Sequence, residues 1–281
     1  MWLLDAQDLG DLDAELTTAL TLVNGDQVYA LSADERAAIL AVYELYDAML
    51  GQPAPGLLPT ELNAARPFMY NAYDQVQIGG RLKALRARLI ASTDACPYCG
   101  FGEVKDLDHY LPRSTYGELA IYPRNLVPSC GPCNNAKRAV YPGMPAAQGP
   151  GLIHAYFQPL PDEDFLHADT VFDADGTLSV TFRVDNPAID PGLAAKLQFQ
   201  LDRLKLNDRY RAQVNKYLSE QRTAMLMLHA AGALVFSDFL QRSSAALVSS
   251  YGRNDWRVAL LRTLAADPEF CAAPNGYLGA P

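Results

Sequence analysis

The sequence lacks a hydrophobic run long enough to cross a membrane. Its longest candidate, residues 224–236, has 13 residues and contains His229 and Gly232, whereas a membrane-spanning helix needs about 20 apolar residues. Residues 1–16 also lack the Lys or Arg that precedes the apolar core of a secretion signal and carry acidic residues instead. We therefore expect a cytoplasmic protein with no membrane association.

An excess of basic residues is also absent. With 23 Lys and Arg against 32 Asp and Glu, the formal net charge is −9. This balance excludes a protein that coats nucleic acid through its overall field. The chain has 281 residues, of which 49% are hydrophobic and 20% are charged. Such a composition is typical of one large or two modest folded domains and excludes a disordered chain.

Cysteine is scarce, but four of the five cysteines form two close pairs, Cys96-Pro-Tyr-Cys99 and Cys130-Gly-Pro-Cys133. Two Cys-x-x-Cys knuckles can place four thiolates around one tetrahedral ion, so the pattern predicts a structural zinc site. A redox dithiol normally uses a single pair, and disulfides are disfavoured in a reducing compartment. The remaining Cys271 stands alone, and we expect it to be an ordinary thiol near the C-terminus.

Helical patterns occupy the first 90 residues. Ser32 followed by Glu35 predicts a capped helix that runs to about Leu50. Residues 51–56 are rich in Gly and Pro and interrupt this pattern. A further helical stretch ends at residues 81–90, where leucine and isoleucine side chains share one stripe.

Residues 141–151 (YPGMPAAQGPG) predict a linker because Pro and Gly disfavour both helix and strand. Residues 170–182 then alternate as a β-hairpin does, with the turn at Asp175-Gly176. A basic helical stretch follows from Leu193 to about Arg222, and two more helical patterns run to about Ala266. We expect three regions, an N-terminal helical region at residues 1–90, a cysteine-containing module at residues 91–141 and a C-terminal region at residues 152–281.

The residues that carry chemistry lie between and just after the two knuckles. Asp108-His109 follows the first pair, Asn125 precedes the second pair, and Asn134 comes directly after its last cysteine, with Lys137 three residues further on. All of these elements stand in order inside one zinc frame. The segment from the first cysteine to the end of this motif resembles the HNH, or ββα-metal, endonucleases of the subclass with two Cys-x-x-Cys knuckles.

This resemblance implies a ββα fold and hydrolysis of phosphodiester bonds. It assigns His109 as the general base, a role that a neutral imidazole suits near pH 7. It also implies that Asp108 and Asn134 bind the catalytic metal ion, while Asn125 ties the loop between the strands and keeps His109 oriented. We prefer Asn134 to its neighbour Asn135 because it directly follows the last cysteine. Asp and Asn offer hard oxygen ligands, so we expect Mg²⁺ or Mn²⁺ at this site, beside the structural zinc.

Basic charge is concentrated around the motif. Residues 81–138 contain nine Lys or Arg and five Asp or Glu, a local net charge of +4. We expect Lys137, Arg113 and Arg138 to contact the nucleic acid, with a solvated surface role as the alternative for Arg113. The basic helical stretch after Leu193 either extends this track or is an ordinary solvated face.

The predicted hairpin and the helix that follows it resemble the tails of HNH proteins encoded beside an ABC-type or AAA-type ATPase in bacterial anti-phage systems of the Septu and retron kind. This second resemblance implies defence or restriction, with an ATPase partner docked on the acidic remainder. We expect a mainly helical α+β protein with a central zinc-stapled ββα module, flanking helices and a C-terminal hairpin. Its expected activity is metal-dependent nicking of DNA at each active site, with double-strand cleavage by an oligomer or by repeated nicking.

Two other functions remain open. A non-catalytic zinc-ribbon adaptor would bind nucleic acid or a partner protein and would need zinc without a second metal. An intron-homing or mobile-element endonuclease would share the chemistry but would usually have a more basic DNA-binding region. His154, His167 and His229 match no metal or triad spacing, so we expect ordinary core or surface roles for them.

Overall fold

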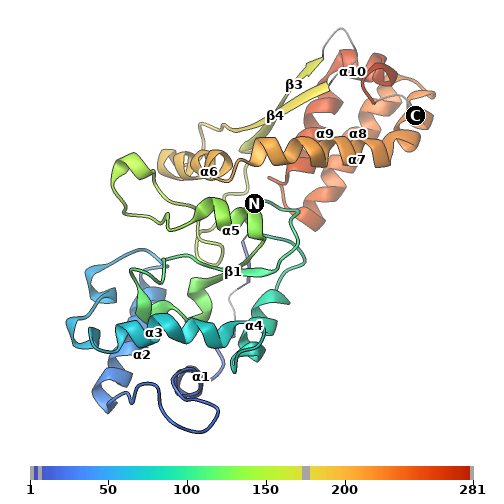
Figure 1. The fold of residues 1–281 in the computed structure, drawn as a ribbon. Helices are drawn as coiled ribbons and strands as arrows, with labels where there is room; N and C mark the ends of the chain where they lie inside the picture. Colours follow the sequence, from blue (N-terminus) through green and yellow to red (C-terminus); the bar gives the residue numbers. More distant parts are fainter. Residues whose placement is uncertain (1–2, 6–7, 173–177, 279–281) are drawn as a thin grey trace. The chain divides into compact units, whose positions relative to one another are not determined.

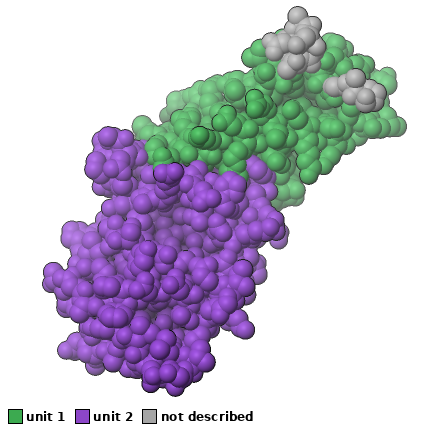
Figure 2. Space-filling view, viewed as in Figure 1, with its two compact units in different colours: residues 1–2, 160–281 green, residues 3–159 purple. Residues whose placement is uncertain are grey.

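The computed structural model describes residues 3–5, 8–172 and 178–278. These residues fold as two compact units (Figure 2). We call residues 3–159 the first unit (purple, unit 2 in the key) and the residues from Leu160 onward the second unit (green, unit 1 in the key). Across the described ranges, helices dominate and each unit contains one two-stranded antiparallel sheet. The expected mainly helical α+β class is therefore confirmed. No helix among the described residues is long and apolar enough to span a bilayer.

The first unit begins with two helices, α1 (Leu12–Ala19) and α2 (Ala33–Ala48) (Figure 1). The predicted cap of α2 is confirmed, because the Glu35 amide donates to the Ser32 hydroxyl at 3.1 Å and the Ser32 amide donates to the Glu35 carboxylate at 2.9 Å. This capping box satisfies two amide groups that the first turn of a helix leaves without partners. The buried face of α2 carries Tyr43 and Tyr46, of which Tyr46 reaches the site described below.

Two further helices of the first unit, α3 (Arg66–Ala72) and α4 (Lys83–Ile90), follow the Gly- and Pro-rich break. In α4 the leucine stripe is buried at Leu85 and Leu89, and this helix packs against both strands of the neighbouring sheet. Short 3-10 turns connect these elements and the loops of the module that follows. They are Pro55–Leu57, Thr60–Leu62, Tyr73–Val76, Gly117–Leu119, Pro123–Asn125 and Ala146–Gln148.

The centre of the first unit is a ββα element. Strand β1 (Asp106–His109) pairs with the antiparallel strand β2 (Leu126–Ser129), and helix α5 (Gly131–Lys137) packs against β1. The register pairs His109 with Leu126 and Asp106 with Ser129. The two strands are joined by a 16-residue connection, residues 110–125, which the 3-10 turns shape. This is the ββα module that the sequence predicts.

The second unit starts with a hairpin, β3 (Leu166–Phe172) and β4 (Leu178–Val184), paired over its full length. The hairpin is thus confirmed, while its predicted turn at Asp175-Gly176 lies outside the described residues. Five helices follow the hairpin in the described residues, and after them comes the 3-10 turn Pro274–Gly276. The helices are α6 (Pro191–Arg203), α7 (Leu206–His229), α8 (Ala233–Tyr251), α9 (Trp256–Ala266) and α10 (Pro268–Ala272).

The expectation of one continuous helical stretch from Leu193 to Arg222 is wrong. Helix α6 ends before Lys205, whose backbone takes the left-handed conformation with φ +51°. Asn207 then anchors the start of α7 to the hairpin, since its side chain accepts from the Phe182 amide at 2.7 Å and donates to the Phe182 carbonyl at 2.9 Å. This tertiary contact overrides a helical periodicity that continues through the break.

Candidate active site

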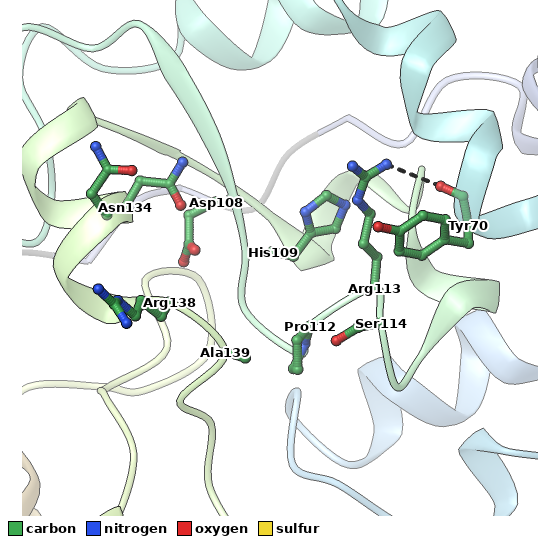
Figure 3. A pocket seen from close by; sticks show the side chains of 10 residues that line it. Tyr70, Asp108, His109, Pro112, Arg113, Ser114, Asn134, Arg138 and Ala139 are labelled. Carbon is green, nitrogen blue, oxygen red and sulfur yellow. Dashed lines mark hydrogen bonds between the residues drawn. The ribbon is translucent and has the colours of Figure 1, made fainter.

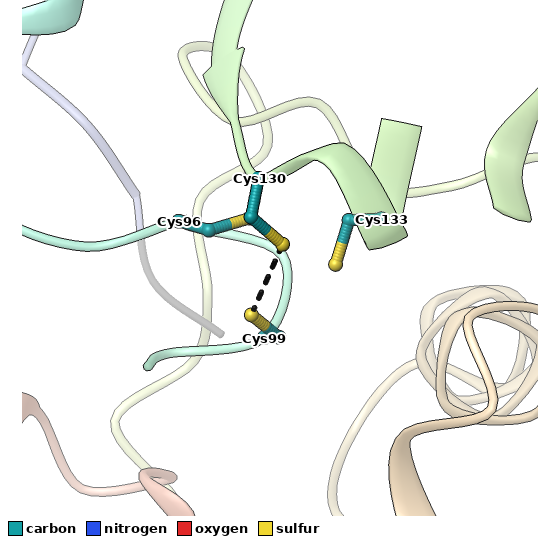
Figure 4. A group of neighbouring side chains, drawn as sticks. All are labelled: Cys96, Cys99, Cys130 and Cys133. Atoms are coloured by element: carbon teal, nitrogen blue, oxygen red, sulfur yellow. Dashed lines mark hydrogen bonds between the residues drawn. The ribbon is translucent and has the colours of Figure 1, made fainter. Parts of the chain in front are cut away.

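The four paired cysteines meet in one buried cluster (Figure 4). Cys96 and Cys99 lie in the turn before β1, whereas Cys130 is the N-cap of α5 and Cys133 lies in its first turn. Their sulfur atoms all lie within 4.8 Å of one another, and Cys99 Sγ and Cys130 Sγ are 3.8 Å apart. Four sulfurs around a tetrahedral zinc ion stand roughly 3.8 Å apart, given a Zn–S distance of about 2.3 Å. The cluster therefore fits the metal that the sequence predicts.

A glycine shapes the first knuckle. The Cys96 amide donates to the Gly102 carbonyl at 2.9 Å, and the Gly102 amide donates to Cys99 Sγ at 3.3 Å. A Cβ atom at Gly102 would lie 2.7 Å from Cys130 Sγ, so the turn has no room for a side chain here. Cys271 is buried in the second unit, where its thiol donates to the Leu264 carbonyl, and takes no part in the cluster.

Asp108 is buried at the middle of β1, with 2% of its surface exposed. Its Oδ2 accepts a hydrogen bond from the Tyr98 hydroxyl at 2.8 Å, and its Oδ1 pairs with Lys137 Nζ at 3.1 Å. Burial raises the pKa of this carboxyl above its usual value, opposed by the charge of Lys137. A carboxylate oxygen can accept more than one bond, so Asp108 keeps acceptor capacity for a cation.

The His109 side chain is half-buried and held by its Nε2 atom, which lies 2.9 Å from the Ala120 carbonyl oxygen. A carbonyl only accepts, so Nε2 carries the proton and Nδ1 of the neutral ring is left as the basic atom. Burial lowers the pKa of His109 to about 3, opposed by the Ala120 contact and reinforced by the charges of Arg113 and Lys137. The edge of the Tyr73 ring packs against the imidazole, with centroids 4.3 Å apart. The ring is thus neutral and fixed in one tautomer.

Asn125 is fully buried and spans the base of the loop between the strands. Its Oδ1 accepts from the Leu111 amide at 2.8 Å, and its Nδ2 donates to the carbonyls of Leu111 and Leu119 at 3.0 and 3.2 Å. Leu119 directly precedes Ala120, whose carbonyl holds His109. The amide therefore ties both ends of the loop, which is the arrangement that the proposed role requires.

Asn134 lies on α5 and faces the same cavity as Asp108 and His109, a hollow of about 540 Å³ (Figure 3). Its Nδ2 donates to Asp106 Oδ2 at 3.2 Å, which leaves Oδ1 as the atom of this amide that can bind a cation. Hard oxygen donors from β1 and from α5 thus line one cavity. This donor set fits a magnesium or manganese ion. Asn135 also lines the cavity.

The three predicted nucleic-acid contacts have different surroundings. Arg113 and Arg138 line the cavity, and the Arg113 guanidinium lies over the rings of Tyr70 and Tyr73 at 4.4 and 4.8 Å from their centroids. Lys137 is fully buried, with Nζ 2.7 Å from the His109 carbonyl oxygen in addition to its pair with Asp108. A phosphate contact needs an accessible cation, so these surroundings favour a structural role for Lys137.

Several site residues were missed from the sequence. Tyr98 lies between the two cysteines of the first knuckle, ten residues before Asp108, and this closeness in sequence to the motif is the signal that could have revealed it. Tyr70 and Tyr73 come from α3 and the turn after it. Tyr46 contacts Asn125 from α2, and His154 contacts Tyr46 from a segment beyond the motif. No spacing connects these four residues to the motif, because the fold alone brings them there.

The family comparison agrees with this geometry. Residues 96–139 match the model of the HNH endonuclease family. The chain contains an HNH endonuclease module. The match begins at the first cysteine of the zinc cluster and ends just after α5, so it encloses the site residues Asp108, His109, Asn125 and Asn134.

Two curated proteins are similar to the chain that holds this HNH module. Protein ea31 of Escherichia phage lambda is 32% identical over 142 residues, which is 47% of this chain and 45% of the relative. The Septu protein PtuB of Bacillus thuringiensis is 30% identical over 86 residues, 29% of this chain and 32% of the relative. The chain thus spans less than half the length of each relative. No solved structure matches it significantly.

Proposed function

We propose that the protein is a metal-dependent endonuclease that hydrolyses DNA phosphodiester bonds and nicks one strand at each active site. The observation that carries the proposal is the contact of His109 Nε2 with the Ala120 carbonyl oxygen. This Nε2–H is engaged by Ala120, so Nδ1 is a free base in a ring that lines the cavity shared with Asp108 and Asn134. A non-catalytic adaptor has no need of such an arrangement.

The chemistry follows from these positions. In the proposed reaction, His109 Nδ1 accepts a proton from water as the water oxygen attacks phosphorus and the bond to the leaving O3′ breaks. Asp108 and Asn134 would hold a Mg²⁺ or Mn²⁺ ion through their side-chain oxygens, and a bound ion would supply positive charge for the phosphoryl and leaving oxygens. Arg113 and Arg138 would bind the phosphate backbone at the cavity rim.

We place this activity in bacterial defence against phage or in restriction, with an ATPase partner. Similarity to the Septu protein PtuB over 86 residues supports a defence role. The other similar protein, ea31, comes from a phage, and it aligns with this chain over 142 residues. Each ββα site would cut one strand, so double-strand cleavage would require an oligomer or successive nicks.

The test is a supercoiled-plasmid assay with added Mg²⁺ or Mn²⁺, using the zinc-loaded full chain. We expect His109→Ala to reduce nicking by about 10² to 10⁴-fold, the usual contribution of a general base. The matched control is His229→Ala, which removes a histidine of the second unit whose Nε2 contacts the Ala272 carbonyl at 3.1 Å. This control should nick as the wild type does.

Metal analysis must find one zinc ion per chain in all three proteins. This control distinguishes loss of catalysis from loss of the folded structure. Equal nicking by wild type and His109→Ala would remove His109 from catalysis and attribute the cleavage to a contaminant. A second test adds a chelator in place of Mg²⁺ and Mn²⁺ and verifies that the zinc ion is retained. Nicking that persists under these conditions would contradict a requirement for a second metal ion.

A further inference from the structure

A buried chain of hydrogen bonds approaches the HNH module from two distant segments of the first unit. His154 Nε2 lies 2.8 Å from the Tyr46 hydroxyl, and this hydroxyl lies 3.1 Å from Asn125 Oδ1. The three side chains are at most 1% exposed. Tyr46 comes from α2, and His154 comes from the segment after the Pro- and Gly-rich stretch at residues 141–151.

The direction of each hydrogen in this chain is determined by its ends. The backbone amide of Tyr156 donates to His154 Nδ1 at 3.1 Å, so Nδ1 is unprotonated and Nε2 carries the proton. Nε2 therefore donates to the Tyr46 oxygen, which frees the Tyr46 hydroxyl proton for Asn125 Oδ1. Burial lowers the pKa of His154 to about 3, so the ring stays in this neutral form at neutral pH.

This chain of hydrogen bonds ends in the loop that joins β1 to β2, residues 110–125. Asn125 Nδ2 donates to the Leu119 carbonyl, and the next residue, Ala120, holds His109 Nε2. His154 also reaches the same loop directly, because its ring packs against that of Tyr110 with centroids 4.1 Å apart. His154 is thus connected to the surroundings of His109 in two ways. One runs through Tyr46 and Asn125 to the segment that holds His109 Nε2, and the other is its ring contact with Tyr110, the next residue after His109.

The backbone beside His154 is shaped to its ring. Gly51 has φ +72°, and a Cβ atom there would lie 2.3 Å from His154 Cδ2. The Gly51 amide donates to the Tyr46 carbonyl at 2.9 Å, which places this glycine directly after the last turns of α2. The end of α2 therefore seats the imidazole against the hydroxyl of Tyr46.

We infer that His154 and Tyr46 are positioning residues of the nuclease site, which orient Asn125 and through it hold His109 in the tautomer that leaves Nδ1 basic. The inference rests on the proposed function for its kinetic consequence, whereas its structural consequence can be measured without cleavage. It assigns a role to a histidine with no recognisable spacing and extends the working site beyond residues 96–139.

The same helix offers a matched control. Tyr43 lies one turn before Tyr46 on α2 and is 2% exposed, but its hydroxyl has no hydrogen-bond partner among the described residues. Tyr43→Phe and Tyr46→Phe therefore make the same chemical change at the same depth. Only the second change breaks the chain to Asn125, so any difference between them measures positioning and not burial.

The kinetic experiment compares these variants in the plasmid assay, with His154→Phe as a second break in the chain. We expect Tyr46→Phe and His154→Phe each to lower kcat roughly tenfold or more, with KM within about twofold of wild type, because a misplaced base slows chemistry and leaves binding intact. The double variant should be no worse than the poorer single variant, since both residues act in one chain. Tyr43→Phe should match the wild type.

The second experiment records the ring ¹⁵N resonances of His109 in zinc-loaded protein without Mg²⁺ or Mn²⁺. The chain has only four histidines, so single substitutions can assign them. We expect wild type and Tyr43→Phe to show one protonated Nε2 and one unprotonated Nδ1, and Tyr46→Phe and His154→Phe to show a mixture of tautomers.

A single Nε2–H tautomer in all of these proteins would overturn the inference, as would a kcat of Tyr46→Phe equal to that of Tyr43→Phe. If no protein cleaves DNA, the proposed function fails, and the tautomer measurement alone decides the positioning role. If either Tyr46→Phe or His154→Phe does not fold, the other variant still interrupts the hydrogen bonds to Asn125 and can be compared with Tyr43→Phe.

Discussion

Lys137 carries a buried charge that is compensated by a buried partner. Its ammonium and the Asp108 carboxylate are buried together, with 0% and 3% of their side chains exposed and 3.1 Å between the charged atoms. Each charge is costly to bury alone, and the pair is tolerated because each neutralises the other. Lys137 also donates to the His109 carbonyl, so it ties the end of α5 to the strand that carries both Asp108 and His109.

We therefore predict that Lys137→Met lowers the free energy of unfolding of the zinc-loaded protein by about 3 kcal/mol or more, because Asp108 is left as an unpaired buried charge or must take up a proton. Urea unfolding monitored by circular dichroism measures this change. The control is Lys105→Met, since Lys105 pairs with Glu103 at the surface with 68% and 75% of their side chains exposed. Its midpoint should stay close to that of wild type.

A phosphate-binding role for Lys137 makes the opposite prediction. A lysine that only contacts DNA would leave the unfolding midpoint unchanged when replaced by methionine, and would weaken binding in a salt-dependent manner. An unchanged unfolding midpoint in Lys137→Met would thus contradict a stabilising role for Lys137 and would support its role as a DNA contact.

In the first zinc knuckle, Gly102 lies too close to the cysteine sulfurs for a side chain to fit without movement. In Gly102→Ala the new Cβ atom would lie 2.7 Å from Cys130 Sγ and 2.8 Å from Cys130 Cβ, so the sulfurs must move apart. We predict that this variant loses zinc to a competing chelator at concentrations that leave the wild type loaded. Gly79→Ala is the control, because no described atom lies within 4 Å of its added Cβ. Equal zinc retention by the two variants would mean that the knuckle can relax around a methyl group.

Elements were predictable from the sequence where local signals decide them. The Ser32 and Glu35 cap, the leucine stripe of α4 and the alternation of β3 and β4 all survive in the structure. The break between α6 and α7 was not predictable in this way. It depends on the left-handed Lys205 and on the contact of Asn207 with Phe182, 25 residues away in the chain, and neither interrupts the helical periodicity.

The same division applies to the candidate site. Residues Asp108, His109, Asn125 and Asn134 could be selected because a family motif and two knuckles fix their spacing, and the structure places three of them around one cavity and Asn125 beneath its loop. Tyr46 and His154 are separated by 108 residues and Tyr46 and Asn125 by 79. Only tertiary packing makes them neighbours, so no pattern in the sequence connects them.

On the scale of the whole molecule, the HNH module is supported by residues well outside the 96–139 match. The Tyr73 hydroxyl donates to the Leu107 carbonyl, the Tyr156 hydroxyl donates to the Leu126 carbonyl, and the Tyr110 hydroxyl donates to the Leu152 carbonyl, each at 3.0 Å. Both strands of the ββα element are therefore held from outside. All of these residues belong to the first unit, residues 3–159.

This support predicts which fragment behaves as a domain. A fragment of residues 3–159 should bind one zinc ion and melt in a single cooperative transition, because it keeps every contact described for the site. A fragment of residues 91–141 keeps the four cysteines but loses the contacts with Tyr46, Tyr73, His154 and Tyr156. Because a chain of about 50 residues buries little surface, losing these contacts should leave it without a stable core. We expect it to bind zinc and yet to lack a cooperative melting transition by circular dichroism. If instead it melts cooperatively and its His109 ring shows the single Nε2–H tautomer, the surrounding helices and the segment around His154 are dispensable to the site, and the positioning role of Tyr46 and His154 is contradicted.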